Sequence, residues 1–278
     1  MEVIATIDKR DVPLEVASCT CFADGSVCFG EDCVQREKLL KVYVNDMLTM
    51  QVGCSEGSLV ELVVGRLFTE GLIRGPEEID CMSICDRSLQ ATVYLKDRQA
   101  DVSRTKVETV PTCCTMNRTF NDYFSTGEAL RPVEPIDWPA EWVFEAVRDF
   151  FDDTPQHRAT RGVHSCRLVN ADGVVVCRED IGRHNALDKA IGTALVQGID
   201  LRGCLAFTSG RVPTDMAVKA VRAGIPVLAT CKVATDKAFE LADEYGLALV
   251  TKAGRRSFSV QERFAPAGAH MGMEKGAA

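Results

Sequence analysis

The feature that most constrains the fold is an alternation of apolar, strand-like runs and amphipathic helical segments from residue 162 onward. Strands are predicted at 163–169, 173–178, 204–208, 226–230 and 247–251. Helices are predicted at 184–197, 213–223 and 235–245, and Asp172-Gly173 predicts a hairpin turn between the first two strands. Strands and helices that alternate at this spacing favour an α/β fold, in which helices cover a mixed sheet.

The residues before this region predict a smaller α+β part. Residues 39–52 have the pattern of a hairpin that turns at Asn45-Asp46. A helix is expected next, with Ser58 and Glu61 forming a capping box at its start. Short strands are expected after this helix, so this part combines a sheet with at least one covering helix.

These patterns divide the chain into four parts: a Cys-rich extension at 1–36, the smaller α+β part at 37–135, the α/β domain at 136–263 and a loose tail at 264–278. The polar stretch near 111–130 contains Cys113 and Cys114 and lacks apolar periodicity. A connection of this length is usually functional or disordered. We therefore expect a mobile loop that carries cysteine.

Composition excludes several classes of partner. A formal net charge of −8 disfavours nucleic acid, because a phosphate backbone is bound by excess Lys and Arg. No apolar run approaches the roughly 20 residues that span a bilayer, and residues 1–10 lack the apolar region of a secretory signal. We expect a cytoplasmic protein without a membrane partner. Its 13 cysteines are then expected to be thiols, four of them in apolar core positions: Cys166, Cys177, Cys204 and Cys231.

Four cysteines near the N-terminus raise the alternative of a metal-binding module. Cys19, Cys21, Cys28 and Cys33 are separated by one, six and four residues, whereas zinc sites prefer pairs with two to four residues between them. A Cys-rich extension is the favoured interpretation, and no tightly held metal is predicted. A zinc-dependent deaminase is set aside, because its Pro-Cys-x-x-Cys pattern is absent from the sequence.

The densest polar segment, residues 178–189, falls between a predicted strand and a predicted helix. Backbone N–H groups and the helix dipole favour an anion at such a position. Gly182 would let the backbone approach a ligand, and Arg183 can bind phosphate through two hydrogen bonds. The alternative is a capped helix with surface ion pairs. The candidate binding residues are Asp180, Gly182, Arg183, His184, Asn185, Asp188 and Lys189.

Three later loops also follow predicted strands. Their candidate binding residues are Ser209, Gly210, Arg211, Thr235, Lys252, Ala253, Gly254, Arg255, Arg256 and Ser257. Ligands of such sheets bind beyond the carboxyl ends of the strands, so these loops together predict a nucleotide-sized site. Taken alone, Thr235 fits a helix N-cap better than a ligand contact. Taken alone, residues 252–257 fit a basic surface turn.

Residues 178–192, REDIGRHNALDKAIG, resemble the characteristic motif of the formate dehydrogenase accessory sulfurtransferases, the FdhD/NarQ family. The same pattern is matched by TSGR at 208–211, MAVKAVRAGIPVLAT at 216–230, GVHSC at 162–166 and FTEG at 68–71. The resemblance spans roughly residues 37–260. It implies a cytidine-deaminase-like α/β fold that is usually dimeric. It also implies that residues 136–263 bind molybdenum bis(molybdopterin guanine dinucleotide) cofactor as a substrate.

The resemblance further implies that Cys113 is the catalytic residue of a sulfurtransferase. It would receive sulfur as a persulfide from a cysteine desulfurase and pass it to the cofactor, before the cofactor enters the formate dehydrogenase apoenzyme. The family's loop carries Cys-x-x-Cys, whereas Met116 stands here in place of the second cysteine. One thiol suffices to hold a persulfide. The rival hypothesis is a non-enzymatic cofactor-binding chaperone that has lost sulfur transfer.

Overall fold

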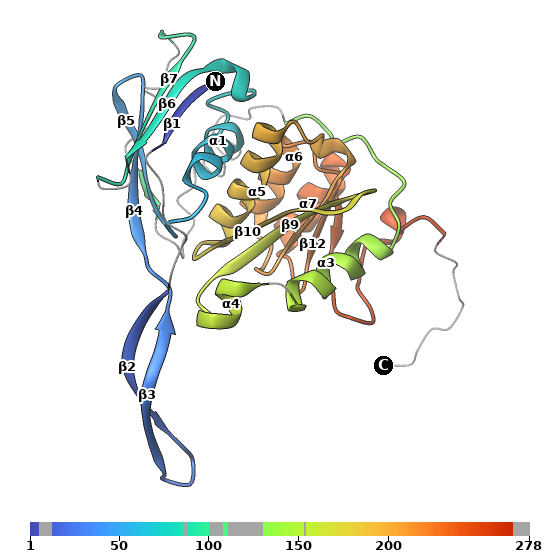
Figure 1. Cartoon of the computed structure of the whole chain (residues 1–278). Helices are drawn as coiled ribbons and strands as arrows, with labels where there is room; N and C mark the ends of the chain where they lie inside the picture. Colours follow the sequence, from blue (N-terminus) through green and yellow to red (C-terminus); the bar gives the residue numbers. More distant parts are fainter. Residues whose placement is uncertain (6–12, 86–87, 100–107, 111–129, 153, 269–278) are drawn as a thin grey trace.

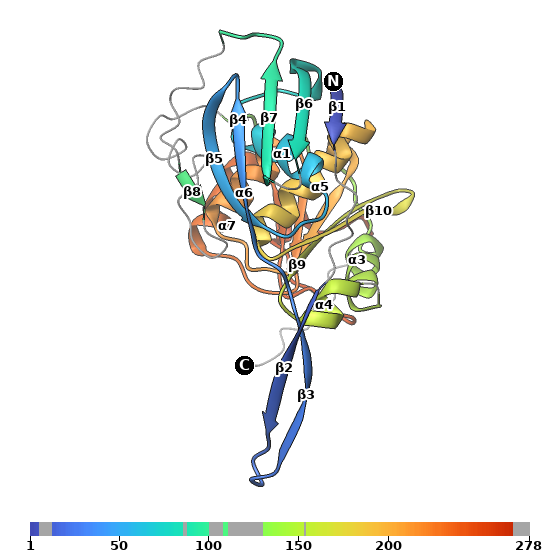
Figure 2. The ribbon, with the colours of Figure 1, turned by 60° about the vertical axis from the view of Figure 1, so that its left-hand side comes forward.

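The computed structural model describes residues 1–5, 13–85, 88–99, 108–110, 130–152 and 154–268. The molecule contains a five-stranded sheet, a six-stranded sheet and a separate two-stranded hairpin. Helices lie between the two larger sheets, and the hairpin extends away from both (Figures 1 and 2). This mixture of mixed sheets and covering helices confirms the predicted α/β fold class.

The five-stranded sheet has the order β10-β9-β11-β12-β13. Its strands are β9 (His164–Asn170), β10 (Gly173–Asp180), β11 (Leu205–Thr208), β12 (Val227–Thr230) and β13 (Ala248–Val250). The last three strands are parallel to one another, and β9 is antiparallel to both of its neighbours. The sheet is therefore mixed, and the carboxyl ends of β11, β12 and β13 meet at one edge.

Helices cover both faces of this sheet. Those of the larger domain are α3 (Glu141–Asp152), α4 (Pro155–Thr160), α5 (Arg183–Gln197), α6 (Thr214–Arg222) and α7 (Asp236–Tyr245). Ala206 of β11 packs in a core with α5, α6 and α7, whereas its neighbours Leu205 and Phe207 pack with α3. This alternation follows from the pleat of a strand, which sends successive side chains to opposite faces. The helices predicted at 184–197, 213–223 and 235–245 are confirmed as α5, α6 and α7, and α4 falls where no helix was predicted.

The hairpin of β9 and β10 turns one residue earlier than predicted. Asn170 pairs with Gly173, so the turn residues are Ala171 and Asp172. Gly173 begins β10 with a φ of +95°, a backbone conformation that glycine adopts without steric cost. The sequence pattern therefore predicted the turn to within one residue, but Gly173 is the first residue of β10 and does not lie at the centre of the turn.

The six-stranded sheet has the order β1-β6-β7-β4-β5-β8. Its strands are β1 (Glu2–Ala5), β4 (Lys38–Val44), β5 (Met47–Cys54), β6 (Ile79–Cys85), β7 (Gln90–Leu95) and β8 (Glu108–Val110). The predicted turn at Asn45-Asp46 is confirmed, because both residues have positive φ, as a type I′ hairpin turn requires. The strand β1 lies within the expected 1–36 extension, yet it pairs with β6.

One helix, α1 (Leu59–Thr69), connects this sheet to the larger domain. Its residues Leu62 and Leu67 pack into the core of the six-stranded sheet. The predicted capping box is wrong: Ser58 has a φ of +55°, and its side chain makes no capping hydrogen bond. The start of α1 instead lies against the larger domain, where Ser55 is hydrogen-bonded to Asp180 and Ile181. Tertiary contacts therefore fix this end of the helix.

The helices α1 and α5 cross at two glycines. A Cβ on Gly65 would lie 1.9 Å from the carbonyl oxygen of Asp188, and a Cβ on Gly192 would lie 1.9 Å from that of Glu61. The two backbones therefore touch directly. The remaining short helices are η1 (Pro76–Glu78), η2 (Leu201–Gly203) and η3 (Glu262–Phe264).

Residues 14–34 form an arm, the hairpin of β2 (Leu14–Cys21) and β3 (Val27–Val34). Almost every residue of the arm is exposed, and β3 contacts α4 near the base of the arm. No apolar periodicity marks residues 14–34 in the sequence, because neither face of the arm is buried. Within the described part of the chain, no group of three or more His, Cys, Asp or Glu side chains is placed to hold a metal ion.

Two cysteines predicted to be core residues are buried, namely Cys166 and Cys204. The prediction is wrong for Cys177 and Cys231, which are only partly buried. Among the described residues, no helix combines the length and the apolar character needed to cross a bilayer.

Candidate functional site

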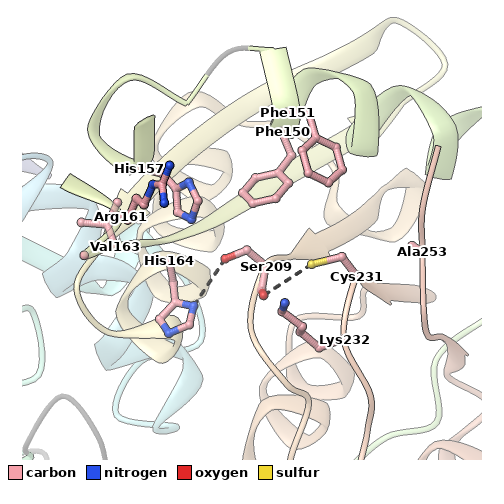
Figure 3. A pocket seen from close by; sticks show the side chains of 11 residues that line it. Phe150, Phe151, His157, Arg161, Val163, His164, Ser209, Cys231, Lys232 and Ala253 are labelled. Carbon is pink, nitrogen blue, oxygen red and sulfur yellow. Dashed lines mark hydrogen bonds between the residues drawn. The ribbon is translucent and has the colours of Figure 1, made fainter. Parts of the chain in front are cut away.

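A cavity of about 510 Å³ opens at the carboxyl ends of β11, β12 and β13 (Figure 3). Such a volume lies within the range of small-molecule sites, roughly 300–1,000 Å³. The cavity is lined by Phe150, Phe151, His157, Arg161, Gly162, Val163, His164, Ser209, Cys231, Lys232 and Ala253. The loops that follow β11, β12 and β13 each contribute at least one residue to this lining, whereas the 178–189 segment contributes none.

Ser209 lies at the centre of the cavity wall, directly after β11. Its Oγ accepts a hydrogen bond from the backbone N–H of Ser165 at 2.9 Å and lies 3.4 Å from Nδ1 of His164. Its carbonyl oxygen accepts a contact from Sγ of Cys231 at 3.5 Å. These bonds join the ends of β9, β11 and β12, so the position of the hydroxyl is fixed by the sheet (Figure 3).

The surroundings of His164 favour the neutral form of its imidazole. Burial lowers the pKa of its imidazole, and the nearby cation Arg183 lowers it further. A neutral imidazole can accept a proton or a hydrogen bond at pH 7. An anion bound beside the ring would favour the protonated form and raise this pKa. The cavity therefore contains a group whose protonation reports on the charge of a ligand.

Positive charge and aromatic rings line the rest of the cavity. Arg161 follows α4 with a φ of +52°, a left-handed conformation that turns the chain into β9. Lys232 is exposed at the end of β12. The ring centres of Phe150 and His157 lie 5.4 Å apart in a tilted arrangement, and the guanidinium of Arg255 lies 5.3 Å from the ring centre of Phe151. This combination suits an anionic ligand with a flat ring.

The binding residues predicted from the sequence fall into three groups: residues at the cavity, residues at its rim or farther out, and residues buried away from it. Ser209 and Ala253 line the cavity. Gly210 lies behind it: a Cβ there would come within 3.0 Å of the Arg183 side chain and within 3.4 Å of His164. Gly182 precedes α5 and donates its N–H to the carboxylate of Asp180 at 2.9 Å. The Arg183 side chain packs against Gly210 and is not among the residues that line the cavity.

Several candidates lie at the rim or farther out. The segment 252–257 forms a turn in which Gly254 N–H donates to the carbonyl of Ser257 at 2.9 Å. Lys252 N–H donates to the carbonyl of Lys232 at 2.7 Å, which ties this turn to the cavity edge. Arg256 is exposed on the turn, and Arg211 is exposed after Gly210. Thr235 is an N-cap, because its side chain accepts from the N–H of Ala238.

The other candidates of the 178–189 segment are buried. Asp180 forms an ion pair with Lys189 at 2.7 Å and accepts hydrogen bonds from Ser55 N–H and from Asn185. Asn185 also donates to the carbonyl of Gly53 at 2.7 Å. These side chains join the end of β5 to the start of α5, so their contacts hold the two parts of the molecule together.

Asp188 lies in a second buried cluster. Its carboxylate contacts Lys219 at 2.6 Å, Arg66 at 3.3 Å and the hydroxyl of Thr69 at 2.8 Å. Glu70 completes the cluster at 3.0 Å from Arg66, so two cations face two anions. These residues come from α1 and its C-cap, from α5 and from α6. The cluster therefore joins the helix of the six-stranded sheet to two helices of the larger domain.

His184 lies beside this cluster, with Nε2 2.8 Å from the carboxylate of Asp215. Burial lowers the pKa of His184, although the hydrogen bond that its ring N–H donates to Asp215 acts to raise it. Burial works to raise the pKa of Asp215, but the bond with His184 and the charge of Lys219 lower it overall. The pair orients the first turn of α5 against α6 and does not line the cavity.

Sequence reasoning named only two of the eleven lining residues, Ser209 and Ala253, as binding residues. Phe150, Phe151, His157 and Arg161 come from the α3–α4 segment, and Cys231 was assigned to the core. The pair Thr154-Pro155 was the available signal for α4, because proline is favoured in the first turn of a helix. The predicted catalytic residue, Cys113, lies outside the described residues.

Known proteins that resemble this chain belong to the family whose motifs the sequence resembles. The model of the FdhD/NarQ family matches residues 35–264. A sulfur carrier protein FdhD of Listeria monocytogenes is 30% identical over 228 residues, covering 79% of this chain and 85% of its own length. One from Geobacillus kaustophilus is 31% identical over 240 residues, covering 86% and 91%.

A crystal structure described as a formate dehydrogenase accessory protein of Desulfotalea psychrophila shares this fold. It superimposes with a TM-score of 0.73 and 23% identity, covering 90% of this chain and 96% of that one. The family model matches most of the chain, including the cavity, the buried clusters, the five-stranded sheet and every strand of the six-stranded sheet except β1. This chain therefore belongs to the FdhD/NarQ family.

Proposed function

We propose that the protein is a sulfur carrier that serves the maturation of formate dehydrogenase. It would take sulfur from a cysteine desulfurase onto Cys113 and deliver it to the molybdenum bis(molybdopterin guanine dinucleotide) cofactor, a bound substrate. The formate dehydrogenase apoenzyme would then receive the cofactor, and the carrier would act as a homodimer. Support comes from membership of the family and from relatives named sulfur carrier proteins at about 30% identity.

The observation that carries the proposal is the cavity at the carboxyl ends of β11, β12 and β13. Its residues fit a guanine nucleotide portion of the substrate. Arg161 and Lys232 would face the diphosphate, and Phe150 and Phe151 would face the base. The cavity would hold only this portion, and the rest of the substrate would lie outside it.

The second candidate is a cofactor-binding chaperone without sulfur transfer. Met116 in place of a second loop cysteine favours it, because a vicinal pair such as Cys113-Cys114 rarely forms a comfortable disulfide. A single thiol can nevertheless carry a persulfide. The two candidates therefore differ in one observable, which is whether sulfur becomes attached to Cys113.

The deciding experiment is intact-mass spectrometry after incubation with a cysteine desulfurase and cysteine. The carrier should gain sulfur, about 32 Da per atom, and Cys113→Ala should gain one atom less. Cys204→Ala is the matched control, because this thiol is buried and should not be loaded. A wild-type protein that binds guanosine diphosphate but gains no sulfur at Cys113 would leave only the chaperone.

A further inference from the structure

The arm, residues 14–34, lies outside the part of the chain that the family model matches, which begins at residue 35. It projects from the body of the molecule in both views (Figures 1 and 2). An isolated two-stranded hairpin is at best marginally stable in water. A projecting hairpin with both faces exposed therefore offers its surface to another molecule.

The arm carries four thiols, Cys19, Cys21, Cys28 and Cys33, and all four are free and exposed. Exposed cysteine is uncommon, because the side chain is among those most often buried. Four exposed thiols within 15 positions are therefore unusual. The strand register also shows that they do not form one cluster, because Cys28 pairs with Thr20 and points to the opposite face from Cys19 and Cys21.

Three of these thiols, Cys19, Cys21 and Cys33, share one face of the arm, but only Cys19 and Cys21 stand directly opposite large apolar side chains. Cys19 is directly opposite Phe29, and Cys21 is directly opposite Val27. Phe29 is 80% exposed and Val27 is 51% exposed. The outer half of the arm thus presents a patch of two thiols beside two exposed apolar groups. Contact with a second protein would bury the apolar groups and bring the thiols against its surface.

We propose that Cys19 and Cys21 are acceptors of sulfur from a protein persulfide, which rests on the proposed function of the chain as a sulfur carrier. The thiolate of one arm cysteine attacks the outer sulfur of the donor's Cys–S–SH group. The donor S–S bond breaks, the donor cysteine leaves as a thiolate that takes up a proton, and a new persulfide forms on the arm. No external oxidant or reductant is consumed.

The charge of the arm indicates what kind of donor surface it fits. Between residues 13 and 35 the sequence has four carboxylates, Glu15, Asp24, Glu31 and Asp32, and neither Lys nor Arg. Charges of one sign attract a surface of the opposite sign, and salt screens that attraction. The donor should therefore present basic side chains, and loading of the arm should decrease as salt is raised.

The test is a peptide map of persulfides after the full-length protein has reacted with a cysteine desulfurase and cysteine. An alkylating reagent traps each persulfide before digestion. Peptides carrying Cys19 or Cys21 should contain about tenfold more sulfur adduct than the peptide carrying Cys85, an exposed thiol on β6. The variant Cys19→Ser/Cys21→Ser should lose this adduct, and Cys28→Ser/Cys33→Ser should keep it.

Adduct on the arm no higher than on Cys85 would overturn the proposal. If Cys113 is loaded in the same map, the proposed function stands and only the arm proposal fails. If the arm is loaded and Cys113 is not, the arm proposal stands and the proposed role of Cys113 fails. Equal loss of adduct in the Cys28→Ser/Cys33→Ser variant would also contradict the assignment to Cys19 and Cys21.

Discussion

Several charged side chains of the polar 178–189 segment are buried in ion pairs. Asp188 is fully buried, and its partners Arg66 and Lys219 come from two other helices. Removing a charge from water costs several kcal/mol, and a partner offsets this cost only at close range with the remaining bonds satisfied. The cluster meets the condition of close range, because Arg66 lies 3.0 Å and Lys219 lies 3.6 Å from Glu70.

Replacing Lys219 by Met should therefore destabilise the fold strongly. The change leaves Asp188 and Glu70 with Arg66 as their remaining cationic partner, and breaking a buried pair typically costs about 3–5 kcal/mol. Urea unfolding measures the free energy of unfolding. Lys237→Met, which removes the exposed pair with Glu240, should change it little. Equal effects of the two substitutions would show that the buried cluster contributes no more to the free energy of unfolding than the exposed pair does.

The lowered pKa of His184 predicts a dependence of stability on pH. The unfolded chain binds a proton near pH 6.5, whereas the folded chain binds it only at lower pH. The stabilising contribution is thus complete above about pH 6.5 and is lost as the pH falls through the lowered folded pKa. His184→Gln should lose less stability than the wild type between pH 7.5 and 5.5 in urea unfolding. A steeper loss in the variant would reverse the assigned sign.

Among the elements, the crossing of α1 and α5 defines how the two parts of the molecule meet. Gly65 and Gly192 allow the backbones to touch, which brings Asp188 within reach of Arg66. Periodicity in the sequence predicted that both helices exist, because each has an apolar face. It could not predict their crossing or the Arg66–Asp188 ion pair, because those depend on residues more than 100 positions apart.

Gly192→Ala should cost stability although alanine is the better helix former. The new Cβ would meet the Glu61 carbonyl, so the helices must separate, and such overpacking costs about 1–3 kcal/mol. Gly203→Ala is the control, because nothing lies within 4 Å of a Cβ there. Thermal unfolding compares the two. An unchanged or higher Tm for Gly192→Ala would mean that the crossing is looser than described.

The same limits apply to other elements. The strand-helix alternation after residue 162 was predictable because each element buries one face. The arm was not, because both of its faces are exposed and produce no period. The capping box at Ser58 failed because the helix start is fixed by contacts with the larger domain rather than by its own side chain.

At the scale of the whole molecule, the site depends on where the chain brings loops together. Sequence reasoning found Ser209 and Ala253, because polar or small residues after a strand mark such loops. It assigned Asp180, Asn185, Asp188 and Lys189 to the same site, although they are buried. A motif rich in charge does not reveal whether its side chains face a ligand or the interior. The α3–α4 wall became visible only in the folded chain.

The cavity can be tested directly through the histidine rings. Of four histidines, His157 and His164 line the cavity, His184 does not, and His270 lies outside the described residues. Adding guanosine diphosphate should shift the ring NMR signals of His157 and His164, raise the pKa of His164, and move His184 far less. Saturable shifts confined to His184, with none at His157 or His164, would place the ligand at the 178–189 segment and contradict the assignment of the cavity.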